Sequence, residues 1–226
     1  MNLAIIPARG KSKRIKNKNI INFLGKPIIY WSIKAAIKTK IFDRIIVSTD
    51  DEKISKLSVK FGAEVPFRRP GHLADGKTEI LDVIKHSVRW FSKNKKEPKN
   101  ICCIFATAPL VNYKRIIQGY KLLKKNKCDF VFSATQNKSS LMRSFYFKKK
   151  KLKMINESFY HFSSQDLPAS FIDAGQFYWA NSQTWLSKKK IFTKSSRIIE
   201  IPNFEACDIN TIEDLNEARQ LALRNR

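Results

Sequence analysis

The stretch Ile5-Ile6-Pro7-Ala8-Arg9-Gly10-Lys11-Ser12-Lys13-Arg14-Ile15 decides how this chain is expected to fold. The apolar run that ends at Ile6 predicts a short buried strand, and Pro7 closes it. The loop that follows combines glycine and serine with four cationic side chains. A buried strand that delivers a basic loop to its carboxyl end is how an open α/β sheet builds a phosphate site. A solvated basic turn after an N-terminal strand is the alternative, and both interpretations stay open on the loop alone.

This stretch matches neither of two common phosphate-binding motifs. Gly10-Lys11-Ser12 looks like the end of a Walker A loop, but Ile5 stands where that motif requires a glycine. The spacing also differs from G-x-G-x-x-G, the pattern of dinucleotide-binding loops. A phosphate site here would therefore belong to another class.

Residues 6–19 resemble the signature I-P-A-R-x-x-S-K-R-x-x-x-K-N of the CMP-sugar synthetases, the cytidylyltransferases that activate sialic-acid-like sugars. This resemblance implies that the loop binds the triphosphate of CTP, because backbone N–H groups and fixed cations both favour oxyanions. The predicted catalytic cations are Arg9, Lys13 and Lys18. The side chains of this loop predicted to contact the nucleotide are Arg9, Ser12, Lys13 and Asn19. Lys11 departs from the family, which often has a second glycine there.

Length and composition indicate a single globular unit. A chain of 226 residues can bury one good core, so we expect one domain over residues 1–226. No apolar run approaches the roughly 20 residues of a membrane-spanning helix, and the N-terminus lacks the long apolar region of a signal peptide. We therefore expect a cytoplasmic protein with no membrane partner. The four cysteines lack the paired spacing of a zinc site, and Cys102 and Cys103 are expected in the core.

The formal net charge of +25 favours an anionic partner, which could be nucleic acid, a membrane surface or a phosphorylated substrate. Much of the charge lies in lysine runs such as residues 93–96, 148–151 and 188–190, and such runs are usually solvated faces. An RNA-binding module stays an alternative and predicts a steep salt dependence of binding. We expect no nucleic-acid partner, since a triphosphate accounts for the cations of the first loop.

Apolar runs of strand length alternate with stretches of helical periodicity along the chain. This alternation predicts a doubly wound α/β fold, in which helices cover both faces of a mostly parallel sheet. The predicted strands are residues 3–6, 45–50, 101–105, 130–134 and 197–201, residues 63–67 are expected to be short and extended, and residues 171–180 are expected to return to the core. The predicted helices are residues 29–37, 51–60, 80–91 and 113–125, followed by a last helix capped by residues 211–214.

Residues 138–170 break this alternation. Between Phe145 and Ile155, apolar residues alternate loosely with lysine and polar residues, which is typical of a β-hairpin. We therefore expect an arm inserted in the doubly wound core. The family resemblance implies that such arms exchange between the subunits of a dimer, so we expect a homodimer.

Further stretches extend the resemblance over essentially the whole chain and imply a Rossmann-like nucleotidyltransferase fold. Residues 42–54 resemble the F-D-x-x-x-V-S-T-D-D-x-x-I of the family. This segment is mainly a feature of the fold. Asp50 and Asp51 are expected at the start of a helix, as capping residues rather than metal ligands.

Two segments are expected beside the nucleotide. Residues 69–75 resemble the family's R-P-x-x-L-A segment, whose arginine lies close to the nucleotide, so Arg69 is a candidate CTP contact and Thr78 is expected to add a hydroxyl nearby. A surface cation before a proline turn is the alternative for Arg69. Thr107 follows a central strand, at the edge where open sheets bind ligands. Phe105 stands where sialic-acid synthetases often have a glutamine, so recognition of the sugar is expected to differ.

Residues 173–179, Asp-Ala-Gly-Gln-Phe-Tyr-Trp, are similar to the D-A-G-Q-F-Y-W of pseudaminic acid cytidylyltransferases, whereas sialic-acid synthetases tend to carry N-G there. The predicted sugar contacts are Gln165, Asp173 and Gln176. The three aromatic residues of this segment are expected in the core. Ser163 stands where the family often has an arginine before S-Q-D.

Residues 208–211, Asp-Ile-Asn-Thr, resemble the family's D-I-D-T, whose aspartates hold Mg²⁺. The predicted metal ligands are therefore Asp208 and Asn210, with Mg²⁺ as the cofactor. An amide oxygen can ligate Mg²⁺ but brings no charge, so Asp208 is the stronger candidate. An Asx turn before the last helix is the alternative for Asn210.

Together these motifs predict an enzyme that transfers CMP from CTP to a nine-carbon α-keto sugar acid, with pseudaminic acid favoured, and releases pyrophosphate. A CMP-sialic or CMP-legionaminic acid synthetase is the alternative within the class. Lys11, Ser163 and Asn210 all depart from the family pattern, so a non-catalytic relative also stays open.

Overall fold

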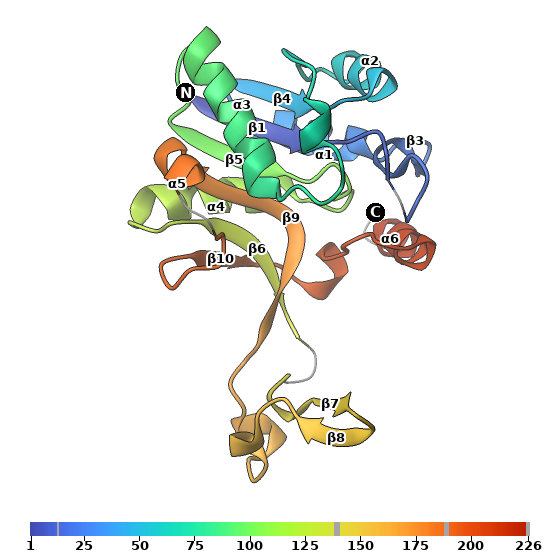
Figure 1. Ribbon diagram of the computed structural model, residues 1–226, viewed down its shortest axis with the longest axis vertical. Coiled ribbons are helices and arrows are strands. Elements are labelled where there is room, and N and C mark those ends of the chain that lie inside the picture. Colours follow the sequence, from blue (N-terminus) through green and yellow to red (C-terminus); the bar gives the residue numbers. More distant parts are fainter. Residues whose placement is uncertain (13, 138–140, 188–189, 225–226) are drawn as a thin grey trace.

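The computed structural model describes residues 1–12, 14–137, 141–187 and 190–224, which form a six-stranded sheet, its helices and a projecting segment (Figure 1). The strand order is β10-β6-β9-β5-β1-β4. The strand bounds are β1 Asn2–Pro7, β4 Arg44–Ser48, β5 Asn100–Ile104, β6 Val131–Gln136, β9 Phe171–Asn181 and β10 Arg197–Glu200. Strand β9 runs antiparallel to both of its neighbours, while the other pairs are parallel. The predicted mostly parallel sheet is confirmed, with β9 as the exception.

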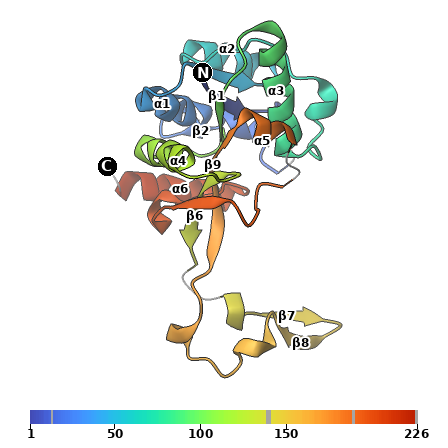
Figure 2. The same cartoon turned by 90° about the vertical axis from the view of Figure 1, so that its left-hand side faces the viewer.

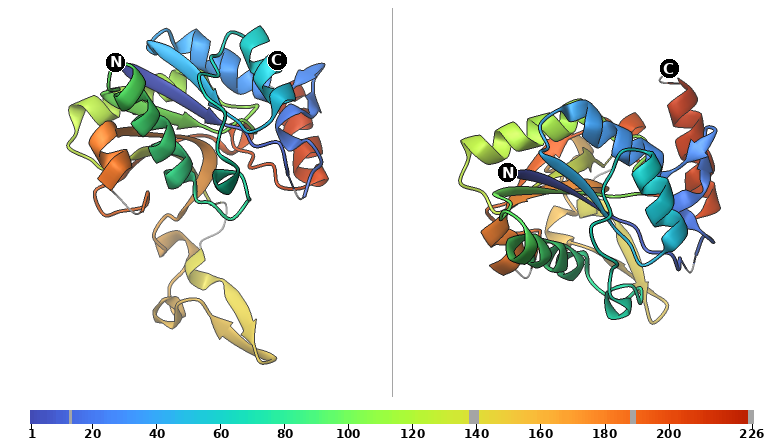
Figure 3. Two further views of the ribbon diagram at one scale, coloured as in Figure 1. Left: turned by 45° about the horizontal axis from the view of Figure 1, so that its top comes forward. Right: turned by 90° about the horizontal axis from the view of Figure 1, so that it is seen from above.

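Helices cover both faces of the sheet, as the views from the side and from above show (Figures 2 and 3). Helices α1 and α4 pack on one face, and α3 and α5 pack on the other. The helix bounds are α1 Ile29–Thr39, α2 Glu52–Lys60, α3 Ile80–Asn94, α4 Tyr113–Lys125, α5 Ser182–Ser187 and α6 Ile212–Arg224. In the part of the chain that the structure describes, no helix combines the length and apolar character needed to cross a membrane.

The apolar run of β1 is continuous because both faces of this strand are covered. Ala4 and Ile6 pack in the core that includes α1 and α4, whereas Leu3 and Ile5 pack in the core under α3. All four side chains are fully buried. This is the pattern expected of a parallel strand inside a doubly wound sheet.

Two predicted helix starts are confirmed in atomic detail. The Asp51 carboxylate accepts a hydrogen bond of 2.9 Å from the Ile54 N–H and caps α2. At α6, Thr211 Oγ1 accepts from the Asp214 N–H at 3.2 Å, and Asp214 Oδ2 accepts from the Thr211 N–H at 2.8 Å. This reciprocal pair is a capping box with aspartate in the acidic position.

The segment at residues 63–67 is short, as predicted, and does not form a full strand of the sheet. It makes only isolated parallel bridges to β4 and its end, Ile46 with Glu64 and Thr49 with Arg68. Pro66 lies between these bridges and has no N–H to donate, so a continuous ladder is not possible there.

A third apolar cluster joins the two ends of the chain. Ile15 from the first loop packs with Ile209 and Leu215, which lie before and within α6. The small hairpin β2 (Asn22–Phe23) and β3 (Lys26–Pro27) completes the cluster through Phe23. This packing places the segment before α6 beside the basic loop, although about 190 residues separate them in the sequence.

Strand β9 carries a large bulge between its first residues, which follow the arm, and the part that pairs with β5. Phe132 pairs with Tyr178, but Ala134 pairs with Asp173, so residues 174–177 oppose the single residue Ser133. Ser133 Oγ accepts hydrogen bonds from the Gln176 and Phe177 N–H groups at 3.3 and 3.4 Å. Bulges of this kind re-aim side chains and are frequent beside active sites.

Replacing Ser133 with alanine is expected to destabilise the fold by about 1–3 kcal/mol, because the buried N–H groups of the bulge lose a side-chain acceptor. Ser87→Ala is the matched control, since its equally buried hydroxyl donates to the Val83 carbonyl within α3. That change should cost less than about 1 kcal/mol. Urea denaturation of the two variants checks the difference, and equal midpoints would contradict it.

Residues 141–170 form the described part of the predicted arm and project away from the sheet (Figures 1 and 2). The hairpin of β7 (Phe145–Lys148) and β8 (Lys151–Met154) confirms the predicted hairpin pattern. Its turn residues Lys149 and Lys150 have φ of 50° and 62°, the paired left-handed conformation of a two-residue hairpin turn. Short 3₁₀ helices occur at Lys18–Ile20, Gly71–Leu73, Leu141–Arg143, Glu157–Phe159, Ser164–Asp166 and Asn203–Glu205.

Candidate active site

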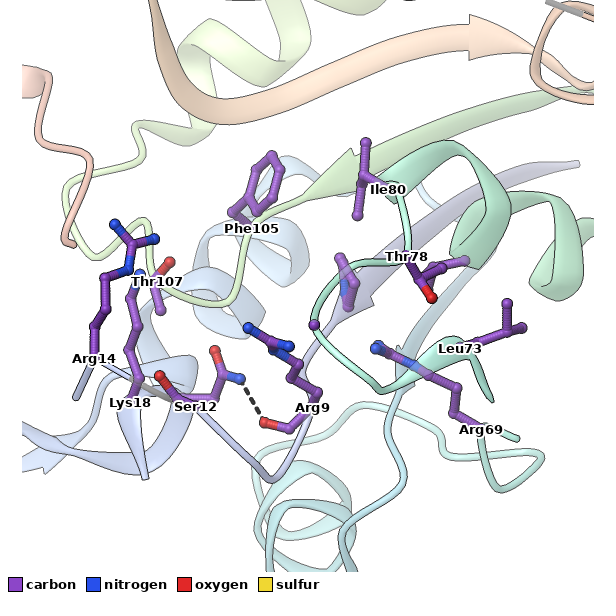
Figure 4. A pocket seen from close by; sticks show the side chains of 14 residues that line it. Arg9, Ser12, Arg14, Lys18, Arg69, Leu73, Thr78, Ile80, Phe105 and Thr107 are labelled. Carbon is purple, nitrogen blue, oxygen red and sulfur yellow. Dashed lines mark hydrogen bonds between the residues drawn. The ribbon is translucent and has the colours of Figure 1, made fainter. Parts of the chain in front are cut away.

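A cavity of about 450 Å³ opens at the carboxyl ends of β1 and β5 (Figure 4). The lining residues that were predicted to bind the nucleotide are Arg9, Ser12, Lys18, Asn19, Arg69, Thr78 and Thr107. The structure therefore brings together three segments that are far apart in the sequence. Lys13, the remaining prediction for this site, lies outside the described residues.

The basic loop is fixed to the sheet and to itself by hydrogen bonds. Gly10 donates its N–H to Asp50 Oδ1 at 2.9 Å, so Asp50 supports the loop rather than a helix start. Asn19 is 9% exposed, and its Nδ2 donates to the Arg9 carbonyl oxygen at 2.8 Å. The amide of Asn19 thus closes the loop, and its predicted contact with the nucleotide stays a prediction.

Arg69 is a buried cation at the back of the cavity. Its side chain is anchored by Ser48, because Nε donates to Ser48 Oγ at 3.1 Å and Nη2 donates to the Ser48 carbonyl oxygen. Burial lowers the pKa of Arg69 to about 10, against the attraction of Asp50. At neutral pH the guanidinium therefore stays charged, and its burial increases the strength of any charge interaction in the cavity.

Thr78 lines the cavity, but its hydroxyl already has partners within its own turn. Thr78 Oγ1 lies 2.9 Å from the His72 carbonyl oxygen and 2.9 Å from Asp75 Oδ1. Asp75 also accepts from the N–H groups of Lys77 and Thr78, and these hydrogen bonds lower the pKa of Asp75 to about 2. The structure therefore gives Thr78 a role in holding the turn, and its contact with a nucleotide stays a prediction.

Lys18 shows how strongly positive one wall of the cavity is. Burial lowers the pKa of Lys18, and the nearby Arg14 and Arg9 act in the same direction. Asp208 and Asp214 oppose this effect. A cavity in which cations crowd one another is arranged for an anionic ligand, whose charge would relieve their repulsion.

Asp173 and Asp208 both lie beside Gly175 of the β9 bulge. Asp208 packs against Gly175 of the β9 bulge, where an added Cβ would lie 3.5 Å from Asp208 Cγ. Asp173 accepts hydrogen bonds from the Gly175 N–H at 3.0 Å and from the Tyr178 hydroxyl. Burial raises the pKa of Asp173, and the charge of Asp208 adds to that effect. Gly175 of the bulge therefore lies between the two acidic residues, as the hydrogen-bond partner of Asp173 and the packing neighbour of Asp208.

The three predicted sugar contacts are not assembled within one chain. Gln176 is only 1% exposed, and its Nε2 donates to the Glu205 carbonyl oxygen. Gln165 is exposed on the projecting arm, in the 3₁₀ helix Ser164–Asp166. Asp173 is not among the residues that line the cavity, and its carboxylate accepts from Gly175 and Tyr178. The assignment of these residues to a sugar stays a prediction, and for Gln176 the structure provides a packing role.

Residues 3–226 match the sequence model of a protein family described as cytidylyltransferase. The chain belongs to this family. It is 40% identical over 221 residues to the pseudaminic acid cytidylyltransferase of Campylobacter jejuni subsp. jejuni serotype O:2, which covers 97% of this chain and 95% of that protein. It is 27% identical over 216 residues to the N-acylneuraminate cytidylyltransferase of Streptococcus agalactiae serotype III, covering 94% of this chain and 51% of that one.

The cytidylyltransferase fold is also found in solved structures. CMP:2-keto-3-deoxy-manno-octonic acid synthetase, in a structure complexed with CTP, superimposes with a TM-score of 0.75. The superposition covers 100% of this chain and 99% of that chain, at 13% sequence identity. At this level of identity the likeness shows the nucleotidyltransferase fold and confirms the predicted fold class.

The role of Asp208 and Asn210 as ligands of Mg²⁺ stays a prediction. Within the described ranges, no group of three or more His, Cys, Asp or Glu side chains could hold a metal ion. Asp208 and Asn210 are adjacent, because Asn210 Nδ2 donates to Asp208 Oδ2 at 2.7 Å. One carboxylate and one amide oxygen are hard ligands of the kind that Mg²⁺ uses when substrate phosphates and water complete its shell.

Several lining residues of the cytidylyltransferase cavity were not predicted. Arg14 belongs to the same signature as Arg9, and its charge could have identified it as a candidate phosphate contact. The apolar lining residues Ile80 and Val83 give no local signal that separates them from core positions, whereas Leu73 and Phe105 stand in segments that the family resemblance had placed near the ligands. Phe105 is held by Tyr178, with ring centroids 5.5 Å apart at an interplanar angle of 75°.

Proposed function

We propose that this cytidylyltransferase transfers CMP from CTP to the anomeric hydroxyl of a nine-carbon α-keto sugar acid, with pseudaminic acid as the substrate. The observation that carries the proposal is the cationic cavity at the ends of β1 and β5, in a chain 40% identical to a pseudaminic acid cytidylyltransferase. The oxygen of the anomeric hydroxyl would form a new bond to the α-phosphorus of CTP, and its proton would pass to water. The bond from that phosphorus to the β-phosphate oxygen would break, and pyrophosphate would leave.

The residues of the basic loop would catalyse the transfer of CMP chiefly by positioning the phosphates and by stabilising their charge. Arg9, Lys13 and Lys18 would hold the phosphates and offset the charge that develops on the transferring group, with Ser12 donating a hydroxyl. Arg69 would meet the nucleotide from the opposite segment. Mg²⁺ held by Asp208 and Asn210 would supply further positive charge to the phosphates.

Pyrophosphate release from CTP and Mg²⁺, measured with pseudaminic, legionaminic and N-acetylneuraminic acids, tests the proposal. We expect the highest kcat/KM with pseudaminic acid. Preference for N-acetylneuraminic or legionaminic acid would favour the second candidate, which the match to N-acylneuraminate cytidylyltransferases supports. No release with any of the three sugars, together with no binding of CTP, would reject the proposed reaction.

Binding of CTP is expected to take up a proton through Lys18 at alkaline pH below 10.5. The pKa of Lys18 in the free protein lies below 10.5, mainly because of burial, and a bound phosphate would raise it. For the same reason the contribution of Lys18 to stability increases as the pH rises toward 10.5, because the unfolded chain holds the proton more tightly.

Calorimetric titration of CTP in two buffers of different ionisation enthalpy measures this proton. Lys18→Arg is the control, since arginine stays protonated throughout and should abolish the buffer dependence. Proton uptake that persists in Lys18→Arg would assign the effect to another group.

We also propose that the chain forms a homodimer through its arm and acts in the cytoplasm. Phe147 and Leu152 pair across the β7–β8 hairpin and are 75% and 58% exposed, so they offer an apolar face that a second subunit would cover. Phe147→Asp and Leu152→Asp are expected to lower the molar mass measured by light scattering from dimer to monomer. Lys153→Asp, on the alternate position of β8, should stay dimeric. A monomeric wild-type protein would reject the dimer.

A further inference from the structure

The turn formed by residues 75–78 lies directly against the side chain of Arg9. A Cβ atom added at Gly76 would lie 2.0 Å from Arg9 Nη1, 3.0 Å from Cζ and 3.3 Å from Nη2. Such distances leave room for a hydrogen atom only. Gly76 also has a φ of +88°, which L side chains rarely adopt. The backbone of Gly76 therefore forms a surface on which the guanidinium of Arg9 rests.

This surface is built without help from Arg9. The Asp75 carboxylate accepts from the N–H groups of Lys77 and Thr78 at 2.9 Å, and the Thr78 hydroxyl ties the turn to the His72 carbonyl. These contacts form an Asx-type turn that is closed by its own hydrogen bonds. The turn can thus restrict Arg9, rather than take its own shape from that side chain.

The guanidinium of Arg9 needs such a restraint. In the described part of the chain, the ion pairs involve Arg44, Lys56, Lys85 and Arg115, and none involves Arg9. An arginine side chain has several rotatable bonds, and ordering it at the moment of binding weakens the binding. Contact with Gly76 limits these conformations before any ligand arrives.

We propose that Gly76 is a positioning residue, which holds the guanidinium of Arg9 toward the cavity so that it is already oriented for the phosphates of CTP. The inference rests on the proposed function of Arg9 as a phosphate contact. If so, the segment after Arg69 has a second role, because it supports the Arg9 side chain of the first loop.

Gly76→Ala tests this directly, since the added methyl group must displace the guanidinium. We expect kcat/KM for CTP to fall by about 100-fold, as a displacement of about 1 Å at a binding group can cause. The dissociation constant of CTP should rise as well.

Gly71→Ala is the control within the same loop, where no heavy atom lies within 4 Å of the new methyl group. Gly25→Ala controls for backbone strain, because its φ of +82° is similar and its surroundings are open. Both controls should bind CTP as the wild type does.

A double-mutant cycle shows whether Gly76 acts through Arg9. In an Arg9→Ala background there is no guanidinium to displace, so Gly76→Ala should cost no more than Gly25→Ala. An equal loss with and without Arg9 would overturn the inference.

If Gly76→Ala does not fold, Asp75→Ala replaces it in the cycle, since it loosens the turn without adding atoms. Normal CTP binding by Gly76→Ala alongside impaired binding by Arg9→Ala would reject only the role of Gly76, whereas normal binding by Arg9→Ala would reject the proposed role of Arg9.

Discussion

Replacing Arg9 with alanine is expected to lower kcat/KM for CTP by about 100- to 1,000-fold while the protein stays folded. The guanidinium lines the cavity beside Lys18 and Arg14, and it lowers the pKa of Lys18 from nearby. Removing it takes away both a fixed charge and a two-pronged donor from the site where we place the triphosphate. Steady-state measurement of pyrophosphate release, with thermal unfolding as a check on folding, gives the result.

Two further substitutions separate the effect of a positive charge inside the cavity from the effect of the overall charge of the protein. Lys16 is exposed in the same loop and does not line the cavity, so Lys16→Ala should leave kcat/KM close to the wild-type value. Arg9→Lys keeps the charge but loses the planar fork, and we expect an intermediate loss. If Arg9→Ala and Lys16→Ala lowered the rate equally, the overall charge of the protein, rather than the cavity, would be responsible.

The first loop and its strand could be predicted because their signals are local. The buried run of β1, the capping side chain of Asp51 and the basic residues after Pro7 each depend on neighbours within a few positions. The same holds for the periodic helix α4, which begins and ends where the spacing of apolar residues predicts, at Tyr113–Lys125. Local patterns therefore determined the elements and the basic wall of the site.

What the sequence did not predict depends on long-range packing. The apolar cluster that contains Ile15 and Ile209 brings Asp208 near the basic loop, and no local pattern predicts this packing. The bulge of β9 likewise needs Ser133 from another strand, and it turns Gln176 into the core and Asp173 toward Tyr178. Six residues were too few to reveal helix α5 by periodicity.

The turn of the arm hairpin shows a different limit. Lys149 and Lys150 adopt positive φ values where glycine and asparagine are usual, so the sequence carries no turn signal at that point. The alternating pattern on either side predicted the hairpin, whereas its register had to come from the structure.

Asp208→Asn is expected to lower kcat by about 100-fold, since it removes the only full negative charge from the predicted metal pair. The change keeps the shape of the side chain, so folding should be retained. The second readout is binding: the affinity of the wild type for CTP should increase with added Mg²⁺, and that increase should be lost in Asp208→Asn. Magnesium-dependent CTP binding that is unchanged in the variant would place the ion elsewhere.

Asn210→Asp tests the same pair in the opposite direction. The structure places the Asn210 amide 2.7 Å from Asp208 Oδ2, so a carboxylate at position 210 would face a like charge and lose a hydrogen bond. In chelator the variant should therefore melt at a lower temperature than the wild type, because neighbouring carboxylates repel each other. Added Mg²⁺ should restore the melting temperature, as a ligand that binds only the folded state stabilises it. A variant that melts like the wild type in chelator, and does not respond to Mg²⁺, would mean that these two side chains do not share a cation. The positive charge at the phosphates of CTP would then have to come from the basic loop alone.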